Sequence, residues 1–234
     1  MTTAEIGTSD PGSWEREYNR GGIPSSVREG PSSSVRDFVA FAATAGVTQG
    51  YAIDVGCGSG RNSLYLAELG FHVTGIDYAA SQVDRLDAAA RELGLSTRLR
   101  SQCHDVRSPW PVEHASQKLA IDAFCFKHQI AHADIDAYVK NAATAVAPGG
   151  LMMVSFAGRG DGYYAQFPIE DDGGAGRLIL DPGNQILSRL YDWNELATLF
   201  QPFTVVHHAT KLGRNEMHGQ AYDRETHVVY LKRV

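Results

Sequence analysis

Three glycines at alternate positions carry the clearest chemical signal in the chain. Gly56, Gly58 and Gly60 follow a short apolar run, residues 51–55, and precede a helical pattern. Glycine has no Cβ, so a ligand can approach such a turn closely and positive φ angles cost little there. A strand, a glycine turn and a helix N-terminus in this order are typical of a nucleotide-binding site.

The spacing around the glycines narrows the kind of nucleotide. A dinucleotide site has the pattern G-x-G-x-x-G, but here Gly60 comes one residue too early, and no Gly-Lys-Ser/Thr follows to make a P-loop. Asp54 lies just before the turn, and Asp77 ends the next apolar run, residues 71–76. An acid at the end of a second strand can accept hydrogen bonds from both hydroxyls of a ribose. The ligand therefore need not carry a phosphate.

The elements that must position these residues alternate along the chain. Periodicity predicts helices at residues 35–45, 62–69, 81–93 (with Ser81 as N-cap), 134–146 and 193–200, and strands at 51–55, 71–76, 95–103, 119–126, 151–156, 203–209 and 226–232. A glycine-rich insert, residues 158–183, separates the fifth strand from the last helix. Strands that alternate with helices in this way indicate a parallel, doubly wound sheet.

Three blocks in this order resemble class I S-adenosylmethionine (SAM) dependent methyltransferases: Ala52–Gly60, Gly75–Asp77 and Ala147–Val154. The resemblance covers residues 35–157 and, more weakly, the rest of the chain. It implies SAM as the cofactor and an α/β fold, Rossmann-like and doubly wound, whose seven-stranded sheet is mostly parallel with an antiparallel edge strand. The alternative is a Rossmann-like domain that binds a dinucleotide or no ligand, because a fold alone does not define a function.

The resemblance also implies which residues contact SAM. Asp77 would accept from the ribose hydroxyls, Tyr78 would pack against the adenine, and Asp105 would accept from its amino group. Asp54 would orient the glycine turn or the α-amino group, and Arg61 would bind the carboxylate. The alternative for Asp77 and Asp105 is that each is an ordinary turn residue. The alternative for Arg61 is a solvated side chain at the start of a helix. The complete set of expected cofactor contacts is Tyr18, Arg20, Asp54, Gly56, Cys57, Gly58, Arg61, Asp77, Tyr78, Asp105, Val106 and Phe126.

The N-terminal segment is similar to the arm of thiopurine and thiol/halide methyltransferases, which folds over SAM. This likeness divides the chain into an arm or lid, residues 1–34, and a SAM-binding domain, residues 35–234. It implies that Tyr18 lies over the cofactor and that Arg20 lies near its carboxylate. The alternative is a helix that caps the sheet with Trp14 in the core.

Four residues are candidates for catalysis: Tyr18, His128, Tyr163 and Tyr222. His128 and His132 are spaced like neighbours on a helix, and either imidazole can act as a base near neutral pH, although a loop histidine is more often simply exposed. Tyr163 and Tyr222 lie in glycine-containing aromatic segments that are expected to cover the site, with loop packing as the alternative. No residue set has the spacing of a metal site.

Composition limits the partners. The net charge of −6 argues against a nucleic-acid-binding protein, and no apolar run is long enough to span a membrane. The first residues lack the features of a signal peptide, and the three cysteines lack paired spacing, so we expect a cytoplasmic protein. The partner expected besides SAM is a small molecule, or SAM alone. The sequence does not indicate an oligomeric state.

Methyl transfer is an in-line displacement with a neutral leaving group, so the protein mainly supplies alignment, desolvation and, where needed, a base. The first hypothesis is a SAM-dependent methyltransferase for a small molecule, with secondary metabolism as its setting. The alternative is a SAM cyclase, in which the α-amino nitrogen attacks Cγ and gives azetidine-2-carboxylate and methylthioadenosine. A third class, a non-catalytic SAM-binding protein, is disfavoured by the intact glycine turn and Asp77.

Overall fold

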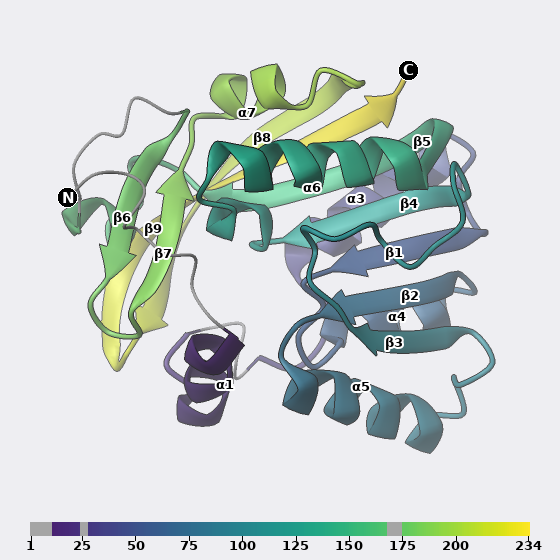
Figure 1. Ribbon diagram of the computed structural model, residues 1–234, viewed down its shortest axis with the longest axis horizontal. Coiled ribbons are helices and arrows are strands. Elements are labelled where there is room, and N and C mark those ends of the chain that lie inside the picture. Colours follow the sequence, from purple (N-terminus) through teal and green to yellow (C-terminus); the bar gives the residue numbers. More distant parts are fainter. Residues whose placement is uncertain (1–10, 24–27, 168–174) are drawn as a thin grey trace.

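The computed structural model describes residues 11–23, 28–167 and 175–234. Its helices are α1 (Pro11–Arg20), α3 (Ser33–Thr44), α4 (Arg61–Glu68), α5 (Ala80–Glu92), α6 (His132–Ala145) and α7 (Trp193–Leu199). Its strands are β1 (Tyr51–Val55), β2 (His72–Asp77), β3 (Leu99–Cys103), β4 (Gln117–Ala123), β5 (Val146–Ala157), β6 (Arg177–Asp181), β7 (Ile186–Leu190), β8 (Phe203–Met217) and β9 (Gln220–Arg233). Figure 1 shows these elements around a main twisted sheet, with β6 and β7 apart from it.

The main sheet has seven strands in the order β3-β2-β1-β4-β5-β9-β8. The first five strands are parallel, and β9 runs antiparallel to both β5 and β8. This confirms the predicted Rossmann-like, mostly parallel seven-stranded sheet. The reversed strand β9 lies one position in from the edge, which β8 forms.

Both faces of the sheet are covered, so its central strands read as continuous apolar runs. On one face α6 and α7 pack with Phe126, Tyr138 and Val154 in a buried cluster. On the other face α3, α4 and α5 pack with Phe38, Leu66 and other buried residues. Cofactor-sized ligands bind beyond the carboxyl ends of the strands in such sheets, where the chain reverses its order between β1 and β4.

A second, two-stranded sheet lies beside the ends of β8 and β9 (Figure 1). Its strands, β6 and β7, fall within and after the segment predicted as a glycine-rich insert, so the sequence did not indicate them. The strands β8 and β9 are also much longer than predicted, and their outer halves form a hairpin that turns at His218 and Gly219. The aromatic segment that carries Tyr222 and was expected to cover the site is therefore mostly strand.

The helix α5 begins one residue earlier than predicted. Its N-cap is Ala79, and Ser81 lies in the first turn. The Ser81 side chain does not cap its own helix, because its hydroxyl and backbone N–H both donate to the carboxylate of Glu15 on α1. An acid beside a helix N-terminus is stabilised by the unpaired N–H groups there, so this contact holds α1 against α5.

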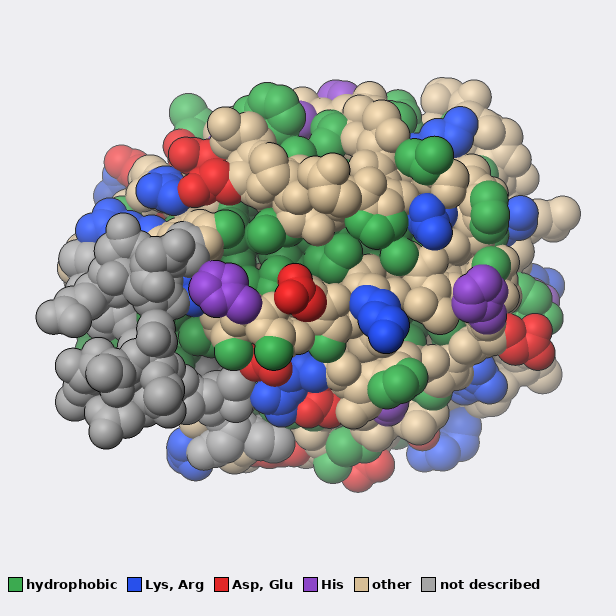
Figure 2. All heavy atoms as spheres, turned by 45° about the horizontal axis from the view of Figure 1, so that its top comes forward, with side chains coloured by type: hydrophobic (Ala, Val, Ile, Leu, Met, Phe, Trp, Pro, Cys, Tyr) green, Lys and Arg blue, Asp and Glu red, His purple; other side chains and the backbone are tan. Residues whose placement is uncertain are grey.

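The described helices include none that is long and apolar enough to cross a bilayer. On the face drawn in Figure 2, acidic, basic and histidine side chains are interspersed, and neither sign of charge covers a large patch.

Candidate functional site

The glycine turn between β1 and α4 forms the centre of the candidate site. Gly56, Gly58 and Gly60 all have positive φ angles, of 70°, 52° and 85°. The backbone N–H groups of Gly56 and Cys57 donate to the carbonyl of Ile76 at 2.8 and 3.0 Å, which ties the turn to β2. A Cβ on Gly56 would lie 2.6 Å from the Cβ of Cys125, so the turn passes close to the segment after β4. Glycine is required here by both conformation and space.

Asp77 joins the end of β2 to the glycine turn. One carboxylate oxygen accepts from the N–H of Gly58 and the other from the N–H of Ala79, both at 2.9 Å. Burial raises the pKa of Asp77, and these two hydrogen bonds oppose the rise. A carboxylate has about four lone-pair sites, so Asp77 keeps the capacity to accept from a ligand hydroxyl.

A cavity opens directly beside this turn. It is lined by Trp14, Tyr18, Gly56, Cys57, Gly58, Ser59, Arg61, Asn62, Asp77, Tyr78, His104, Asp105, Val106, Arg107, Ala123, Phe124, Cys125, His128 and Gln129. Nine of the expected cofactor contacts lie there together. Backbone without side chains, an acid at the end of β2 and an aromatic residue beside it fit the adenosine and methionine parts of SAM.

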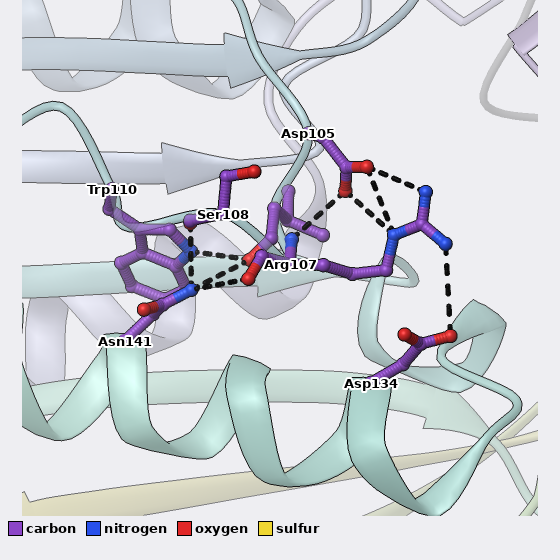
Figure 3. Close-up of polar contacts among 7 residues, drawn as sticks. Asp105, Arg107, Ser108, Trp110, Asp134 and Asn141 are labelled. Carbon is purple, nitrogen blue, oxygen red and sulfur yellow. Dashed lines mark hydrogen bonds and ion pairs between the residues drawn. The ribbon is translucent and has the colours of Figure 1, made fainter.

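The loop after β3 forms one wall of the cavity (Figure 3). Arg107 binds the carboxylate of Asp105 with two nitrogens, at distances between 2.6 and 3.0 Å, and lies 3.8 Å from Asp134 on α6. The guanidinium holds the pKa of Asp105 below its usual value. Asn141 of α6 donates to the backbone carbonyls of this loop, with the shortest bond, 2.7 Å, to Ser108. The loop is thus fixed by α6, and Asp105 stays ionised.

The helix α1 lies over the glycine turn. The hydroxyl of Tyr18 would be 3.0 Å from a Cβ on Gly58, and burial beside Asp77 raises the pKa of that phenol. Trp14, one turn earlier, contacts the ring of His128 edge-on, with 4.7 Å between the ring centroids. The aromatic face of α1 therefore closes one side of the cavity.

A second cavity of about 460 Å³ adjoins the first. The two share four lining residues, Trp14, Arg61, Phe124 and His128. The second cavity extends between the N-terminal segment and the β8–β9 hairpin, and its other lining residues are Ile23, Arg28, Glu29, Pro31, Ser32, Ser33, Ser34, Arg36, Lys127, Tyr164, Lys211, Leu212, Gly213, Asn215, Met217, Arg224 and Thr226. A molecule placed there would lie next to a ligand on the glycine turn.

His128 stands between the two cavities. Its Nδ1 lies 2.9 Å from the carbonyl of Leu187, which can only accept, so Nδ1 carries the proton and Nε2 keeps a lone pair. Burial and the neighbouring charge of Lys127 lower the pKa of His128 well below its usual value. The imidazole is therefore neutral at neutral pH and can accept a proton. His132 is exposed at the start of α6 and lines neither cavity.

The structure places two of the four predicted catalytic residues outside both cavities. Tyr163 is buried in an apolar cluster with Ile179 and Met217, and its hydroxyl donates to Asp181 at 2.7 Å. Tyr222 packs edge-on against Tyr163, and its hydroxyl donates to Gln220. Both tyrosines lie in the cluster beside β6 and β7, so neither lines a cavity here, and their catalytic role stays a prediction.

Three predicted cofactor contacts also lie away from the first cavity. Asp54 is buried behind the turn, where Ser63 donates to it at 2.6 Å, and burial raises its pKa to about 7. Phe126 is fully buried in the core below α6, because β4 ends at Ala123, three residues before its predicted end. Arg20 donates to the carbonyl of Gly183 beyond β6. Asp54 can therefore hold the turn against α4, and it does not line this cavity.

Several lining residues had no clear signal in the sequence. Phe124 and Cys125 follow the true end of β4, so the rule that ligands bind at strand ends finds them once the strand is shortened. Phe124 has a positive φ of 76°, which is unusual for a bulky residue and is seen mostly at functional sites. The sequence did not indicate a role for Lys127, because lysine is almost always exposed, yet here its side chain is 2% exposed.

Within the described ranges, no group of three or more histidine, cysteine, aspartate or glutamate side chains is arranged to hold a metal ion.

Comparisons with known proteins agree with this geometry. Residues 52–150 match the family described as a methyltransferase domain. A ubiquinone biosynthesis O-methyltransferase of Methylobacterium nodulans is 35% identical over 104 residues, which are 44% of this chain and 39% of that protein. The chain thus matches well under half the length of this curated relative.

Two solved structures show the same fold over most of the chain. One is a 1,6-didemethyltoxoflavin N1-methyltransferase of Burkholderia thailandensis with bound 1,6-didemethyltoxoflavin and S-adenosylhomocysteine. It has a TM-score of 0.67 and 21% identity, and the alignment covers 96% of this chain and 87% of that one. The other is a SAM-dependent methyltransferase of Methanosarcina mazei, with a TM-score of 0.67, 18% identity, and coverage of 88% and 99%. At these identities the likeness establishes the fold.

Proposed function

We propose that this chain is a SAM-dependent methyltransferase that transfers the methyl group of SAM to a small molecule; the match of residues 52–150 to a methyltransferase domain and the shared fold support this. One observation carries the proposal. The cavity on the glycine turn adjoins a second cavity through shared lining residues, so a cofactor and an acceptor can bind in neighbouring cavities. The cyclase alternative needs no second place.

The cofactor would lie on the glycine turn. Asp77 would hold the ribose hydroxyls, Tyr78 would pack on the adenine, and Asp105 would accept from its amino group. Arg61, at the start of α4, would bind the carboxylate. SAM bound in this way supplies a methyl group on a sulfonium sulfur. When the methyl group is transferred, that sulfur becomes a neutral thioether.

The chain's own residues would align the acceptor and exclude water. The helix α1, as the core of an arm over the cofactor, closes the site with Trp14 and Tyr18. His128 is the proposed base, since its Nε2 is unprotonated and its ring borders both cavities. A general base of this kind contributes roughly 100- to 10,000-fold to a rate.

The test begins with purified protein, SAM and mass spectrometry. We expect SAM to bind and to remain intact until an acceptor is added, after which S-adenosylhomocysteine forms. Methylthioadenosine produced from SAM alone, together with a cyclic amino acid, would support the cyclase instead. Failure to bind SAM would contradict both.

The proposed base has its own test once an acceptor is found. His128→Asn should lower kcat by about 100-fold and leave SAM affinity unchanged, because the side chain acts on the acceptor rather than on the cofactor. His132→Asn, on the exposed start of α6, is the matched control and should leave kcat unchanged.

A further inference from the structure

The second cavity is strongly basic although the chain carries a net charge of −6. One carboxylate, that of Glu29, and six cationic side chains line it: Arg28, Arg36, Arg61, Lys127, Lys211 and Arg224. Two of the six have acid partners, since Arg224 lies 2.7 Å from Asp161 and Lys211 lies 2.5 Å from Asp37. The lining therefore keeps an excess of positive charge.

Three of the other cationic side chains form hydrogen bonds only with neutral groups. Arg28 donates to the side-chain oxygen of Asn215, and Arg36 donates to a backbone carbonyl at 3.3 Å. Lys127 donates to the hydroxyl of Ser188 at 3.2 Å. Among the residues that the structure describes, none forms an ion pair with Arg28, Arg36 or Lys127. The sixth cation, Arg61, has the cofactor carboxylate as its proposed partner.

Lys127 is the buried member of this group. Its amine lies 3.8 Å from the centre of the Tyr164 ring, and the side chain is 2% exposed. Burial and Arg224 lower the pKa of Lys127 to about 7, while Asp161 and Asp181 oppose the shift. An ammonium has three donors, and the bond to Ser188 uses one. A buried amine without an acid partner is rare in proteins unless a ligand supplies the opposite charge.

The rest of the lining is apolar and aromatic. Trp14, Phe124, Tyr164 and Met217 border the same cavity as Lys127. Such surfaces bind flat or aliphatic groups, while a few polar side chains fix their orientation. Arg28 and Arg36 are exposed, so they raise the local concentration of anions without being desolvated.

We propose that the second cavity binds the methyl acceptor as a small organic anion, whose negatively charged oxygen group contacts Lys127 and whose apolar body packs on Trp14 and Phe124. This inference rests on the proposed methyl transfer and adds the chemical class of the acceptor. The anion restores the full charge of the Lys127 amine, so binding above neutral pH takes up a proton.

The experiment uses the full chain saturated with S-adenosylhomocysteine, so that the cavity on the glycine turn is occupied. Benzoate, cinnamate and indole-3-acetate are compared with their uncharged amides by ligand-observed NMR. We expect at least one acid to bind at least tenfold more tightly than its amide. Acids that bind no better than their amides, or do not bind at all, would overturn the inference.

Two variants assign the contact. Lys127→Gln should weaken binding of the acid by at least tenfold, and Arg28→Gln, at an exposed position, should weaken it by about threefold. Arg214→Gln removes the same charge from β8 outside the cavity and should change the affinity by less than twofold. Equal losses in Lys127→Gln and Arg214→Gln would show that only net charge matters and would contradict the proposed contact.

Proton uptake provides an independent readout. Calorimetry at pH 8 in two buffers of different ionisation enthalpy should show that the folded wild type takes up protons on binding the acid, and that Lys127→Gln takes up none. Absence of uptake in the wild type would overturn the assignment of Lys127. Failure to bind S-adenosylhomocysteine in the first step contradicts the proposed function itself, and is therefore distinguishable from failure of this inference.

Discussion

The glycine turn on the proposed cofactor side is held by residues close in sequence, whereas the proposed acceptor side is held by segments far apart in the chain. On the cofactor side Gly58 binds Asp77, and Ser63 binds Asp54. On the acceptor side the N–H of His218 donates to the carbonyl of Gly22 at 2.8 Å. The first set needs β1, the turn, α4 and β2 to form, while the second joins segments from opposite ends of the chain.

This difference shows where function can vary. The cofactor side makes its close contacts with backbone and with two buried acids, so few substitutions are compatible with it. The acceptor side consists of α1, the β6–β7 sheet and the outer hairpin of β8 and β9, whose side chains can change without disturbing the glycine turn (Figure 1). A shared fold can therefore keep one cofactor and serve many acceptors.

The largest effect is expected from Gly60→Ala. Gly60 has φ of 85°, and a Cβ there would lie 2.1 Å from Cδ1 of the buried Leu86. Left-handed backbone costs an alanine roughly 1–2 kcal/mol and overpacking a core roughly 1–3 kcal/mol. We expect a loss of about 4 kcal/mol in the free energy of unfolding, measured by urea denaturation, together with loss of SAM binding.

Two glycines serve as controls for this loss. Gly94→Ala has the same sign of φ, 68°, but open space around the added methyl, so it should cost only the backbone share. Gly213→Ala, on β8 of the acceptor side, has open space and no positive φ, and should leave stability and SAM binding unchanged. A loss in Gly213→Ala as large as in Gly60→Ala would contradict the contrast between the two sides.

The two sides should also differ in the pH dependence of stability. Asp54, on the cofactor side, has a pKa raised to about 7 by burial, whereas its unfolded value is near 4. The folded form therefore binds more protons between these values, and the protein gains stability as the pH falls from 7 to 5. Because Asp54 is already half protonated at pH 7, the gain from Asp54 over this range is about 2 kcal/mol.

Lys127, on the acceptor side, gives the opposite slope. Its folded pKa is about 7, so between that pH and the unfolded value of 10.5 the unfolded chain binds more protons and stability rises with pH. Asp54→Asn should flatten only the acid limb of a stability profile, and Lys127→Gln only the alkaline limb. A single variant that flattens both limbs would show that the two sides are not energetically separate.

The cofactor side could be predicted well from sequence because its signals are local. Asp54, the three glycines and Asp77 fall on β1, the turn and the end of β2, and the alternation of strands and helices predicts the parallel pairing of the central strands. For Asp54 the sequence left two roles open, and a two-residue period could not show that Ser63, in the first turn of α4, would donate to its carboxylate.

The acceptor side could not be predicted because its contacts are long-range. Tyr163 and Tyr222 have the composition of a pocket cover, but their position depends on β6 and β7, which lie in a segment without a clear period. Lys127 follows a buried strand end and resembles any loop lysine until Ser188 of β7 and Tyr164 are placed against it. Position along the chain carries no signal for such packing.

Asp77→Ala tests the cofactor side more gently. The change removes the proposed acceptor of the ribose hydroxyls and a charge-assisted hydrogen bond, so SAM affinity should fall by about 2 kcal/mol, or roughly 30-fold. Isothermal titration calorimetry measures this directly. Asp84→Ala, at an exposed position of α5, is the charge-matched control. Equal affinity of Asp77→Ala and the wild type would remove Asp77 from the site.

The smallest effect is expected from Tyr163→Phe on the acceptor side. The hydroxyl of Tyr163 donates to Asp181, which also accepts from Gly183 at 2.8 Å, so its loss leaves that oxygen with one partner. Stability should fall by about 1 kcal/mol, while SAM affinity and the rate of methyl transfer stay within twofold of the wild type. A variant that keeps its stability but loses turnover would show that Tyr163 takes part in the reaction. That result would require the β6–β7 sheet to move toward the glycine turn when both ligands are bound, and the separation of the two sides would then hold only for the free protein.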